Sequence, residues 1–439
     1  FIQNPMNNLE IVILAAGKGT RMNSSIPKVL HPLGGKPIIE HVLDTARSLK
    51  PKKIHLVLNK EIKNEFNHLK NKINLIIQKK QLGTGDAVNV AIKSFQKNSN
   101  ILVLYGDVPL THSSTLKKII KFKKNEINIL CFNKEEQNNY GKVVLGTNGL
   151  VNEIIEQKEL KRKENFYLCN SGIFSIHSSL LQKLMPKINN KNMKKEYYLT
   201  DIFKMASNSD IKIKSVITSE KEVQGINDKK DLAMAENEFQ ENLRAKHLKA
   251  GVTMHDPSTV YLSEDTKIGK DVTIHPFVVI GKNVKILNGA EIYSFSHLED
   301  CKIGKRASIG PYARIRPGTQ INDQTKVGNF VEVKNSIIDT NSKINHLSYV
   351  GDSIIGKNVN VGAGTITCNY DGKAKYKTVI KDNAFIGSNS SLVAPLEVGK
   401  NAYIGSGSTI TKKVKQDSLA VERSVQMEVK NWAKRKNKK

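Results

Sequence analysis

A glycine-rich segment followed by fixed positive charges stands near the start of the chain. LAAGKGTRM (residues 14–22) is followed by PK at 27–28. Glycines let a backbone approach a phosphate closely, and successive N–H groups form a nest for an anion. Arg21 and Lys28 would neutralise the charge that builds up on a transferring phosphoryl group. The segment matches neither GxGxxG nor a P-loop, so by itself it only suggests phosphate chemistry.

Two further segments would extend such a site. QLGTG (81–85) is a tight polar turn that could hold a base or a ribose. YGDVP (105–109) follows an apolar run, which places Asp107 at the carboxyl end of a predicted strand. A carboxylate there suits Mg²⁺, which prefers hard oxygen ligands and retains waters. A structural turn or a helix cap would account equally well for Asp107 on its own.

A third group of residues suits acyl transfer. Acetylating an amine needs a base for its proton and donors for the oxyanion formed from a thioester, and histidine titrates near neutrality. His346 comes two positions after Ile344, an apolar repeat position that would point inward, so we expect its side chain to face outward. RIRPG (314–318) and EVK (332–334) place charges at outward positions of earlier repeats. An ordinary surface histidine is the alternative, but stacked coils about 4.8 Å apart would bring these charges together.

The first half of the chain alternates two kinds of element. Short apolar runs are typical of buried parallel strands, and helical patterns lie between them. The expected strands are 10–14, 54–58, 73–77 and 101–104, and the expected helices include 38–49 and 87–95. This alternation predicts βαβ units, a mostly parallel sheet and ligands at the carboxyl ends of the strands. Residues 228–250 then predict one connecting helix, capped by Asp228 or Asp231 and followed by Gly251.

After this helix, apolar residues recur every six positions, and glycine often follows them directly. The series are Leu262, Ile268, Ile274, Ile280, Ile286, Ile292 and Leu298; Ile303, Ile309, Ile315, Ile321, Val327 and Val333; and Ile386, Leu392, Val398, Ile404 and Ile410. Helices repeat at 3.6 residues and coiled coils at seven, so this period predicts a parallel β-helix. The glycines are expected at corners with unusual backbone angles. Residues 367–378 fit no hexad and predict a loop that leaves the coil, where solenoids usually carry function.

Composition limits the class of protein. The 439 residues are 39% hydrophobic, and no apolar run approaches the length of a membrane span. No secretory signal is recognised, and the four cysteines show no metal or disulfide spacing, which favours a cytoplasmic protein. The net charge of +28 raises the question of nucleic-acid binding, but only nine of 69 basic residues are arginine and the lysines are spread out. We therefore expect no nucleic-acid partner, a basic surface that concentrates anionic substrates, and a solvated basic tail at 434–439.

The motifs in combination resemble a known family. LAAGKGTRM, the following PKV, QLGTG, YGDVP, NSG at 170–172 and GIN at 225–227 look like sugar-nucleotide pyrophosphorylases. With the hexad half, residues 9–423 resemble the GlmU family, bacterial enzymes that are both N-acetylglucosamine-1-phosphate uridyltransferases and glucosamine-1-phosphate acetyltransferases. The resemblance implies a Rossmann-like α/β nucleotidyltransferase domain at 6–227, a linker helix at 228–251, a left-handed β-helix acetyltransferase domain at 252–423 and a basic tail at 424–439. It also implies a homotrimer with acetyl sites between subunits, making UDP-N-acetylglucosamine for the cell wall and envelope.

By motif, the resemblance assigns roles to single residues, with Arg21, Lys28 and His346 as the catalytic ones. Uridine-nucleotide contacts would be Leu14, Ala15, Ala16, Gly17, Lys28, Gln78, Gly83, Thr84, Tyr105, Gly106 and Asp107. The sugar would contact Gly141, Glu156 and Asn170, and Mg²⁺ would be bound by Asp107 and Asn227. Glucosamine 1-phosphate would contact Arg316, Lys334, Tyr349, Asn360 and Lys375, with Asn369 and Tyr370 beside the acetyl group and Glu332 orienting His346. Acetyl-CoA, the co-substrate, would contact Ala363, Ser388, Ser406 and Arg423.

Two departures and two rival interpretations remain at this point. Asp86 stands where the family commonly has histidine, and Ser406 where alanine is common. One rival keeps only the nucleotidyltransferase and makes the hexad half structural or regulatory, but a structural coil would need neither His346 nor the NYDG loop at 369–372. The other rival is a non-catalytic binding or scaffold protein, against which Lys28 and Asp107 argue.

Overall fold

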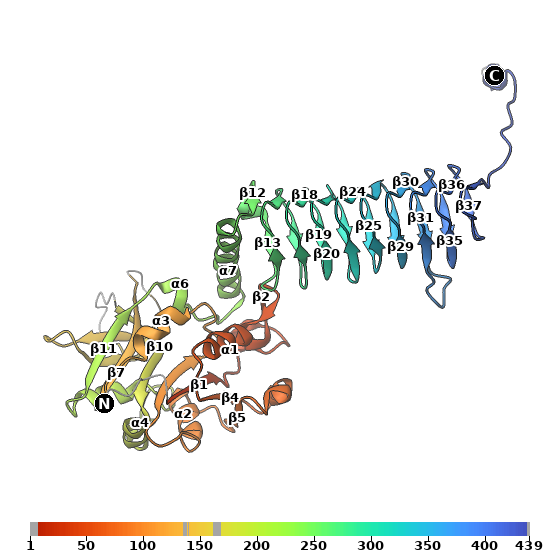
Figure 1. Cartoon of the computed structure of the whole chain (residues 1–439). Coiled ribbons are helices and arrows are strands. Elements are labelled where there is room, and N and C mark those ends of the chain that lie inside the picture. The colour runs from red at the N-terminus through yellow and green to blue at the C-terminus, as the bar shows by residue number, and fades with distance from the viewer. Residues whose placement is uncertain (1–7, 135–137, 139, 161–167, 437–439) are drawn as a thin grey trace. The chain divides into compact units, whose positions relative to one another are not determined.

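The computed structural model describes residues 8–134, 138, 140–160 and 168–436. Met6, the predicted start of the N-terminal domain, and the last three residues of the basic tail lie outside these ranges. The chain forms two compact units, residues 1–239 and 240–439, whose elements can be followed in Figure 1. Within the described ranges, no helix is both long and apolar enough to cross a bilayer.

A nine-stranded sheet forms the centre of the first unit. Its order is β11 (Lys212–Ile217), β7 (Glu126–Asn133), β10 (Leu168–His177), β6 (Asn100–Tyr105), β1 (Leu9–Ala15), β4 (Lys53–Leu58) and β5 (Asn74–Ile77), with β8 (Lys142–Leu145) and β9 (Val151–Ile155) as a side branch. β1 runs parallel to β4 and β6, whereas β10 runs antiparallel to β6 and β7. The four predicted strands are therefore β1, β4, β5 and β6, adjacent and parallel, so their carboxyl ends share one edge.

Helices cover both faces of this sheet. They are α1 (Ile38–Ser48), α2 (Thr84–Ile92), α3 (Ser113–Ile119), α4 (Ser178–Leu184), α5 (Asp201–Ser207) and α6 (Glu220–Val223), and a small hairpin joins β2 (Pro32–Leu33) to β3 (Lys36–Pro37). β1 is buried along its whole length because apolar side chains leave both of its faces. Ile11 and Ile13 pack with α1, whereas Val12 and Leu14 pack with α2. The predicted helix at 87–95 begins three residues earlier, at Thr84.

The predicted connecting helix is α7 (Lys229–Lys249). In the first unit, the Glu236 carboxylate accepts a hydrogen bond from the Gly34 N–H (2.8 Å), and Phe239 packs edge-on against His41. In the second unit, Gln240 bonds both the N–H and the C=O of Leu262, at 2.9 and 2.7 Å. These bonds satisfy backbone groups of an edge strand that has no earlier coil to pair with.

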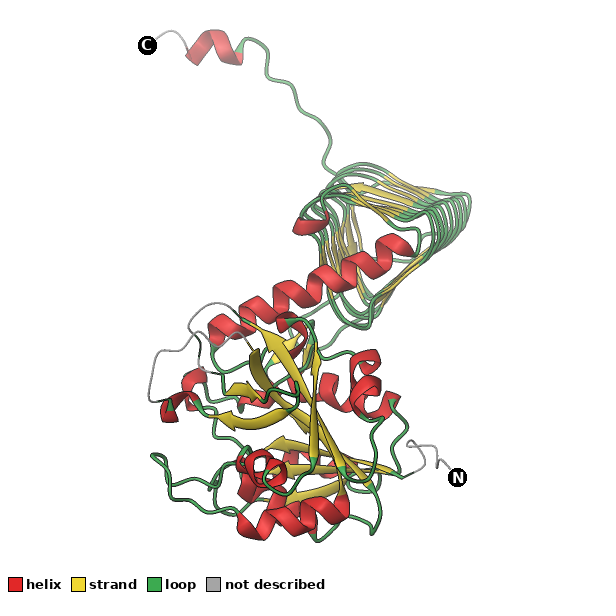
Figure 2. Cartoon of the chain, turned by 90° about the vertical axis from the view of Figure 1, so that its left-hand side faces the viewer, coloured by secondary structure: helices red, strands yellow, loops and turns green. Residues whose placement is uncertain are grey.

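The second unit is a left-handed parallel β-helix whose three sides are parallel sheets, seen along the coil axis in Figure 2. The first side contains β12 (Thr253–Met254), β15 (Thr273–Ile274), β18 (Glu291–Ile292), β21 (Ser308–Ile309), β24 (Lys326–Asn329), β27 (Lys343–His346), β30 (Asn360–Val361), β33 (Phe385–Ile386), β36 (Tyr403–Ile404) and β38 (Leu419–Ala420). The second contains β13 (Tyr261–Leu262), β16 (Val279–Ile280), β19 (His297–Leu298), β22 (Arg314–Ile315), β25 (Glu332–Lys334), β28 (Tyr349–Gly351), β31 (Ile366–Cys368), β34 (Ser391–Val393) and β37 (Thr409–Ile410). The third contains β14 (Lys267–Ile268), β17 (Lys285–Ile286), β20 (Cys301–Ile303), β23 (Thr319–Ile321), β26 (Ile337–Ile338), β29 (Ser353–Ile355), β32 (Thr378–Ile380) and β35 (Leu396–Val398).

The hexad residues point inward as predicted, but the glycines have a different role. Ile274, Ile292 and Val333 are completely buried. Apart from Gly310, whose φ is 96°, the glycines directly after the apolar positions do not adopt positive φ; a Cβ on Gly304 would lie 2.4 Å from the backbone of the next coil, at Asn322. Close backbone approach therefore requires Gly304, and the prediction of unusual angles at these positions is wrong except at Gly310. Asparagine, aspartate and aromatic residues occupy most of the left-handed corners instead.

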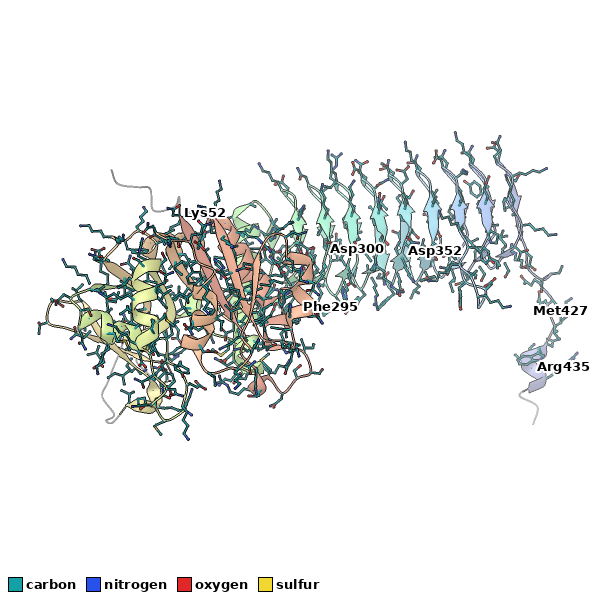
Figure 3. The ribbon with its side chains drawn as sticks, turned by 90° about the horizontal axis from the view of Figure 1, so that it is seen from below. Lys52, Phe295, Asp300, Asp352, Met427 and Arg435 are labelled. Atoms are coloured by element: carbon teal, nitrogen blue, oxygen red, sulfur yellow. The ribbon has the colours of Figure 1, made fainter. Side chains whose placement is uncertain are left out.

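The predicted loop begins two residues later than expected. Thr367 lies in β31, is 2% exposed and pairs with Leu392 of the next coil. Its hydroxyl accepts a hydrogen bond from the Gly351 N–H at 2.8 Å. Thr367 thus fills an inward position although it is polar, and the loop spans residues 369–377, visible in Figure 1 as a protrusion from the coil. The described part of the basic tail leaves the last coil and includes the short helix α8 (Trp432–Lys436), with Met427 and Arg435 marked in Figure 3.

Candidate active sites

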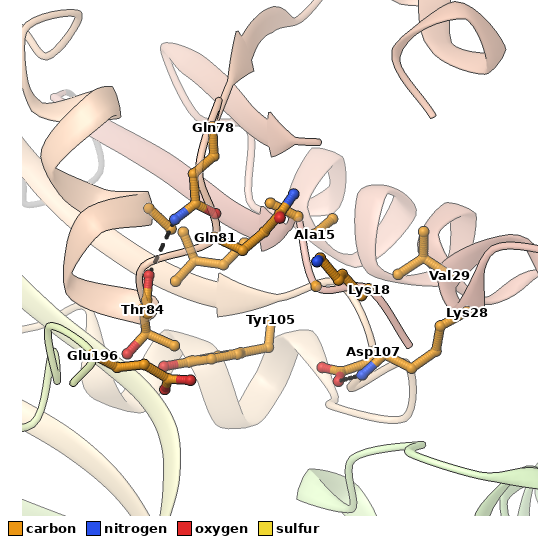
Figure 4. Close-up of a pocket in the computed structure, with 15 residues that line it drawn as sticks. Ala15, Lys18, Lys28, Val29, Gln78, Gln81, Thr84, Tyr105, Asp107 and Glu196 are labelled. Carbon is orange, nitrogen blue, oxygen red and sulfur yellow. Dashed lines mark hydrogen bonds and ion pairs between the residues drawn. The ribbon is translucent and has the colours of Figure 1, made fainter. Parts of the chain in front are cut away.

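A cavity of about 520 Å³ opens at the carboxyl ends of β1, β5 and β6 (Figure 4). Its position follows from the sheet, because parallel strands present their following loops along one edge. It is lined by Leu14, Ala15, Ala16, Gly17, Lys18, Lys28, Val29, Gln78, Gln81, Gly83, Thr84, Ala87, Tyr105, Asp107 and Glu196. The structure thus brings together ten of the eleven residues expected to contact a uridine nucleotide, Lys28 and Asp107 among them; Gly106 does not line the cavity.

One end of this cavity is charged. Lys28 forms an ion pair with Asp107, and the two side chains are only 13% and 19% exposed (Figure 4). Lys28 lies close against the glycine turn because Gly19, with φ of 63°, has no side chain; a Cβ there would lie 2.6 Å from Lys28 Cβ. Arg21 Nη2 donates to Asn227 Oδ1 at 2.9 Å. Backbone nest, guanidinium and ammonium together suit a polyphosphate.

The residues expected to bind Mg²⁺ approach each other through the backbone. The Ile226 N–H donates to the Asp107 C=O at 2.9 Å, which places Asn227 beside Asp107. Among the described residues, no three His, Cys, Asp or Glu side chains gather as a metal-binding group. Two hard oxygen donors nevertheless fit Mg²⁺, because this ion keeps several waters and takes further oxygens from substrate phosphates.

The opposite end of the cavity is polar and mostly uncharged, with Gln78, Gln81 and Thr84. Tyr105 forms its floor; burial raises the pKa of its hydroxyl, and the nearby negative charges of Glu156 and Asp107 raise it further. Tyr105 is therefore a neutral, apolar surface suited to a ring. A Cβ on Gly172, whose φ is 86°, would lie 2.7 Å from this ring, which explains the glycine of the NSG triplet.

The expected sugar contacts lie beside Tyr105. The Asn170 N–H donates to the Gly141 C=O at 2.9 Å, and Glu156 accepts a hydrogen bond from the Thr200 hydroxyl at 2.8 Å. Glu196 lines the cavity but was absent from the predicted site, because it lies in an irregular segment that carries none of the motifs. Its placement comes from the neighbouring Tyr197, whose backbone pairs with the 81–85 turn at Leu82 and Gly85.

On the β-helix, His346 is exposed at the end of β27. Its Nδ1 lies 2.7 Å from the Oδ1 of Asn329, the residue below it in the preceding coil. An amide oxygen only accepts, so Nδ1 carries the proton and Nε2 keeps a lone pair. Within one chain, Glu332 accepts a hydrogen bond from Arg316 at 2.7 Å, and its expected role toward His346 stays a prediction. Asn329, which the sequence did not indicate, is the residue that bonds His346 here.

A cluster of positive charges lies on the second side of the coil. A hydrogen bond with Lys375 and repulsion from Lys375 and Arg316 lower the pKa of Lys334. Asp352 partly offsets this charge and accepts a hydrogen bond from the buried Asn369. Lys375 belongs to the 369–377 loop, where it pairs with Tyr370. Cations held this close favour a bound dianion such as a phosphate.

The residues expected to contact acetyl-CoA form one column on successive coils with His346. Ala363, Ser388 and Ser406 each follow an inward residue by two positions, as His346 does. Their backbones are linked: the Gly364 N–H donates to the His346 C=O, the Asn389 N–H to the Ala363 C=O, and the Gly407 N–H to the Ser388 C=O. Arg423 Nη1 donates to the Ser406 C=O at 3.1 Å. The small side chains leave an open strip along the coil. Within one chain, His346 is the last residue of β27 on the first side, whereas Lys334 is the last residue of β25 on the second side.

The remaining two amino-sugar residues are divided between the sides. Asn360 starts β30 on the first side and pairs with Lys343. Tyr349 lies on the second side, where a Cβ on Gly351 would be 2.5 Å from its hydroxyl and 2.8 Å from the Asn369 amide. Tyr349 therefore joins Asn369 near the cationic cluster.

Comparisons with known proteins agree with this geometry. Residues 11–169 match the MobA-like NTP transferase domain, residues 260–299 and 377–412 match the bacterial transferase hexapeptide repeat, and residues 297–370 match the GMPPB C-terminal domain. The bifunctional protein GlmU of Paramagnetospirillum magneticum is 43% identical over 98% of this chain and 96% of its own length. The proteins of the same name from Bradyrhizobium sp. and Wolbachia pipientis are 45% and 42% identical, over 94% and 95% of this chain and 94% and 97% of their own lengths.

The fold and the two sites define a transferase that joins a nucleotidyltransferase unit to a hexapeptide β-helix. Such enzymes differ in substrate, so the class alone does not name one. The identity over nearly the whole chain does: this protein belongs to the GlmU family. The predicted family and fold class are confirmed.

Proposed function

We propose that the chain makes UDP-N-acetylglucosamine in two steps, acetylation of glucosamine 1-phosphate on the β-helix and then uridylyl transfer on the sheet unit. One observation carries the proposal: a single chain holds a nucleotide-sized cavity with a Lys28–Asp107 pair and, separately, a β-helix with a histidine column and a cationic cluster. Membership of the GlmU family supports both halves.

In uridylyl transfer, a phosphate oxygen of N-acetylglucosamine 1-phosphate attacks the α-phosphorus of UTP in line, and pyrophosphate leaves. No protein nucleophile takes part. The backbone of residues 14–17 with Arg21 and Lys28 holds and neutralises the phosphates, while Gly141, Glu156 and Asn170 orient the sugar. Asp107 and Asn227 would hold Mg²⁺, which supplies charge neutralisation at the phosphates.

In acetyl transfer, the amine nitrogen of glucosamine 1-phosphate attacks the thioester carbonyl, His346 Nε2 takes the amine proton, and coenzyme A leaves as the thiol. Arg316, Lys334 and Lys375 bind the sugar phosphate. Tyr349, Asn360, Asn369 and Tyr370 complete the amino-sugar and acetyl site. Acetyl-CoA lies along the column of Ala363, Ser388 and Ser406 as far as Arg423.

We further infer a homotrimer through the β-helix. An apolar ridge of stacked rings supports it: Phe277, Phe295, Tyr312 and Phe330 follow one corner at centroid spacings of 4.8–5.1 Å. All four have φ between 54° and 61°, a conformation that costs about 1–2 kcal/mol for such residues, and each is about half exposed. Burial between copies would offset that cost. Sedimentation analysis should give three chains per particle, and a monomer at assay concentration would exclude the assembly.

A cytoplasmic location fits the substrates and the thiols. All four cysteines are free, and burial raises the pKa of Cys301 to about 12, which keeps that thiol unreactive.

The test follows two products from one reaction. Purified protein receives glucosamine 1-phosphate, acetyl-CoA, UTP and Mg²⁺, and free thiol and pyrophosphate are measured together. Both products should appear, and omitting acetyl-CoA should stop both; supplying N-acetylglucosamine 1-phosphate should then restore pyrophosphate alone. Pyrophosphate without thiol would leave only the nucleotidyltransferase, and neither product would indicate a non-catalytic protein.

A further inference from the structure

Gln78 has an unusually well-fixed side chain at the uncharged end of the nucleotide cavity. It is 3% exposed, and its Nε2 donates to the Gly83 C=O at 3.2 Å and to Asp86 Oδ2 at 2.8 Å. Asp86 is in the first turn of α2 and does not line the cavity, so it can act on a ligand only through Gln78. Both partners lie on one side of the amide.

The carboxylate decides which way the amide faces. An ionised carboxylate and a carbonyl oxygen only accept hydrogen bonds, so both must meet the NH₂ group of Gln78. Figure 4 shows the Gln78 nitrogen on the side of the bond to Gly83 and the oxygen on the other side. Reversing the amide would place its oxygen against two acceptors at once. Gln78 is therefore held as an acceptor toward a ligand.

The distribution of charged side chains indicates that the base of a bound nucleotide would lie at the Gln78 end of the cavity. Lys28, Lys18 and the glycine turn attract the phosphates to the other end, and Gln78, Gln81 and Thr84 are the uncharged polar side chains left to contact a ring. Uracil presents an N3–H donor to an acceptor, whereas cytosine presents a lone pair at N3. A fixed acceptor accordingly favours uracil, and an amide free to reverse would serve either base.

We propose that Asp86 is a positioning residue that sets base selection, by locking Gln78 so that its oxygen reads the N3–H of uracil. This rests on the proposed uridylyl transfer. Histidine, common at this position in the family, both donates and accepts and would fix the amide less strictly.

The experiment measures kcat/KM for UTP and for CTP, with N-acetylglucosamine 1-phosphate, in the wild type, Asp86→Asn and Asp86→Glu. Asparagine is nearly isosteric but can also donate, so the UTP:CTP ratio should fall at least about 10-fold. Glutamate keeps the acceptor and should hold the ratio within about 3-fold of the wild type. If turnover of Asp86→Asn is too slow, the dissociation constants of UTP and CTP measured by calorimetry give the same ratio.

If Asp86 had a purely structural role, Asp86→Asn would lower kcat/KM for UTP and for CTP equally and leave their ratio unchanged. That result would overturn the proposal. Absence of pyrophosphate release by the wild type is a different outcome, because it refutes uridylyl transfer itself. The UTP:CTP ratio of the variants therefore tests the role of Asp86, and turnover by the wild type separately tests uridylyl transfer.

Discussion

Replacing Lys28 with alanine tests the charged end of the nucleotide cavity. The Lys28 ammonium pairs with Asp107, and both side chains are mostly buried. Truncation removes a cation from the phosphates and leaves the Asp107 carboxylate without it. Two separate losses follow, one in catalysis and one in stability.

The sizes of these losses can be worked out from the contact. Loss of a preorganised donor to transition-state charge costs about 10²–10³-fold in rate, and we expect that fall in uridylyl transfer. A hydrogen bond to a charged group contributes about 1.5–3 kcal/mol, so unfolding of the first unit should become easier by about that amount. In Lys28→Ala/Asp107→Ala no charge is left unpaired, so its stability loss should be smaller than the sum of the two single losses.

The assay compares pyrophosphate release, thiol release and thermal unfolding in the single and double variants. Lys52→Ala, an exposed lysine that precedes β4, is the matched control and should match the wild type in all three (Figure 3). Acetyl transfer should stay at the wild-type rate throughout. Uridylyl transfer within about 3-fold of the wild type in Lys28→Ala, or strictly additive stability losses, would refute the reasoning.

Three more outcomes are expected. His346→Ala should lower thiol release by about 10²–10⁴-fold and leave pyrophosphate release from N-acetylglucosamine 1-phosphate intact; parallel loss of both would refute separate sites. Arg316→Ala should raise KM for glucosamine 1-phosphate by about 10-fold or more with little change for acetyl-CoA, and an unchanged KM would remove Arg316 from the phosphate site. Burial acts to raise the pKa of Glu10, but hydrogen bonds, led by the one from His55, lower this pKa overall. The first unit should therefore lose stability as the pH falls through and below 4.5. Glu10→Gln should flatten that pH dependence in thermal melts, and an equally steep curve in the variant would contradict the assignment.

The sequence predicted the β-helix well because its signal is repeated and local. Each inward residue occupies the same environment as its neighbours one coil away, so a period of six specifies fold and register together. The inward position of Thr367 was not predicted because the repeat was traced through apolar residues. The Thr367 hydroxyl is inside the coil because it accepts a hydrogen bond from the Gly351 N–H, and Gly351 is itself held in register by pairing with Lys334. The need for glycine at position 304 could not be predicted correctly from the sequence. It comes from contact with the backbone of the neighbouring coil and not from the backbone angles of Gly304 itself.

Residues predicted for one site come together in the structure where short motifs follow adjacent strands. Lys28 and Asp107 meet because β1 and β6 are neighbours whose carboxyl ends share an edge. Glu196 and Asn329 were missed for a different reason: each is placed by pairing with a distant segment, and neither residue type nor spacing reports that pairing. Resemblance also assigned Glu332 to His346; within one chain this carboxylate bonds Arg316, and its role toward His346 stays a prediction.

The two sites should respond independently to mutation, because each is held by contacts inside its own unit. The bonds that fix Lys28, Arg21 and Gln78 all end on residues below 240, and those that fix His346 and Arg316 end on residues above it. Non-additive effects of two substitutions arise when residues share partners or a network. A variant in one set therefore changes one product while leaving the other, and this lets the paired thiol and pyrophosphate measurement assign each residue to a reaction.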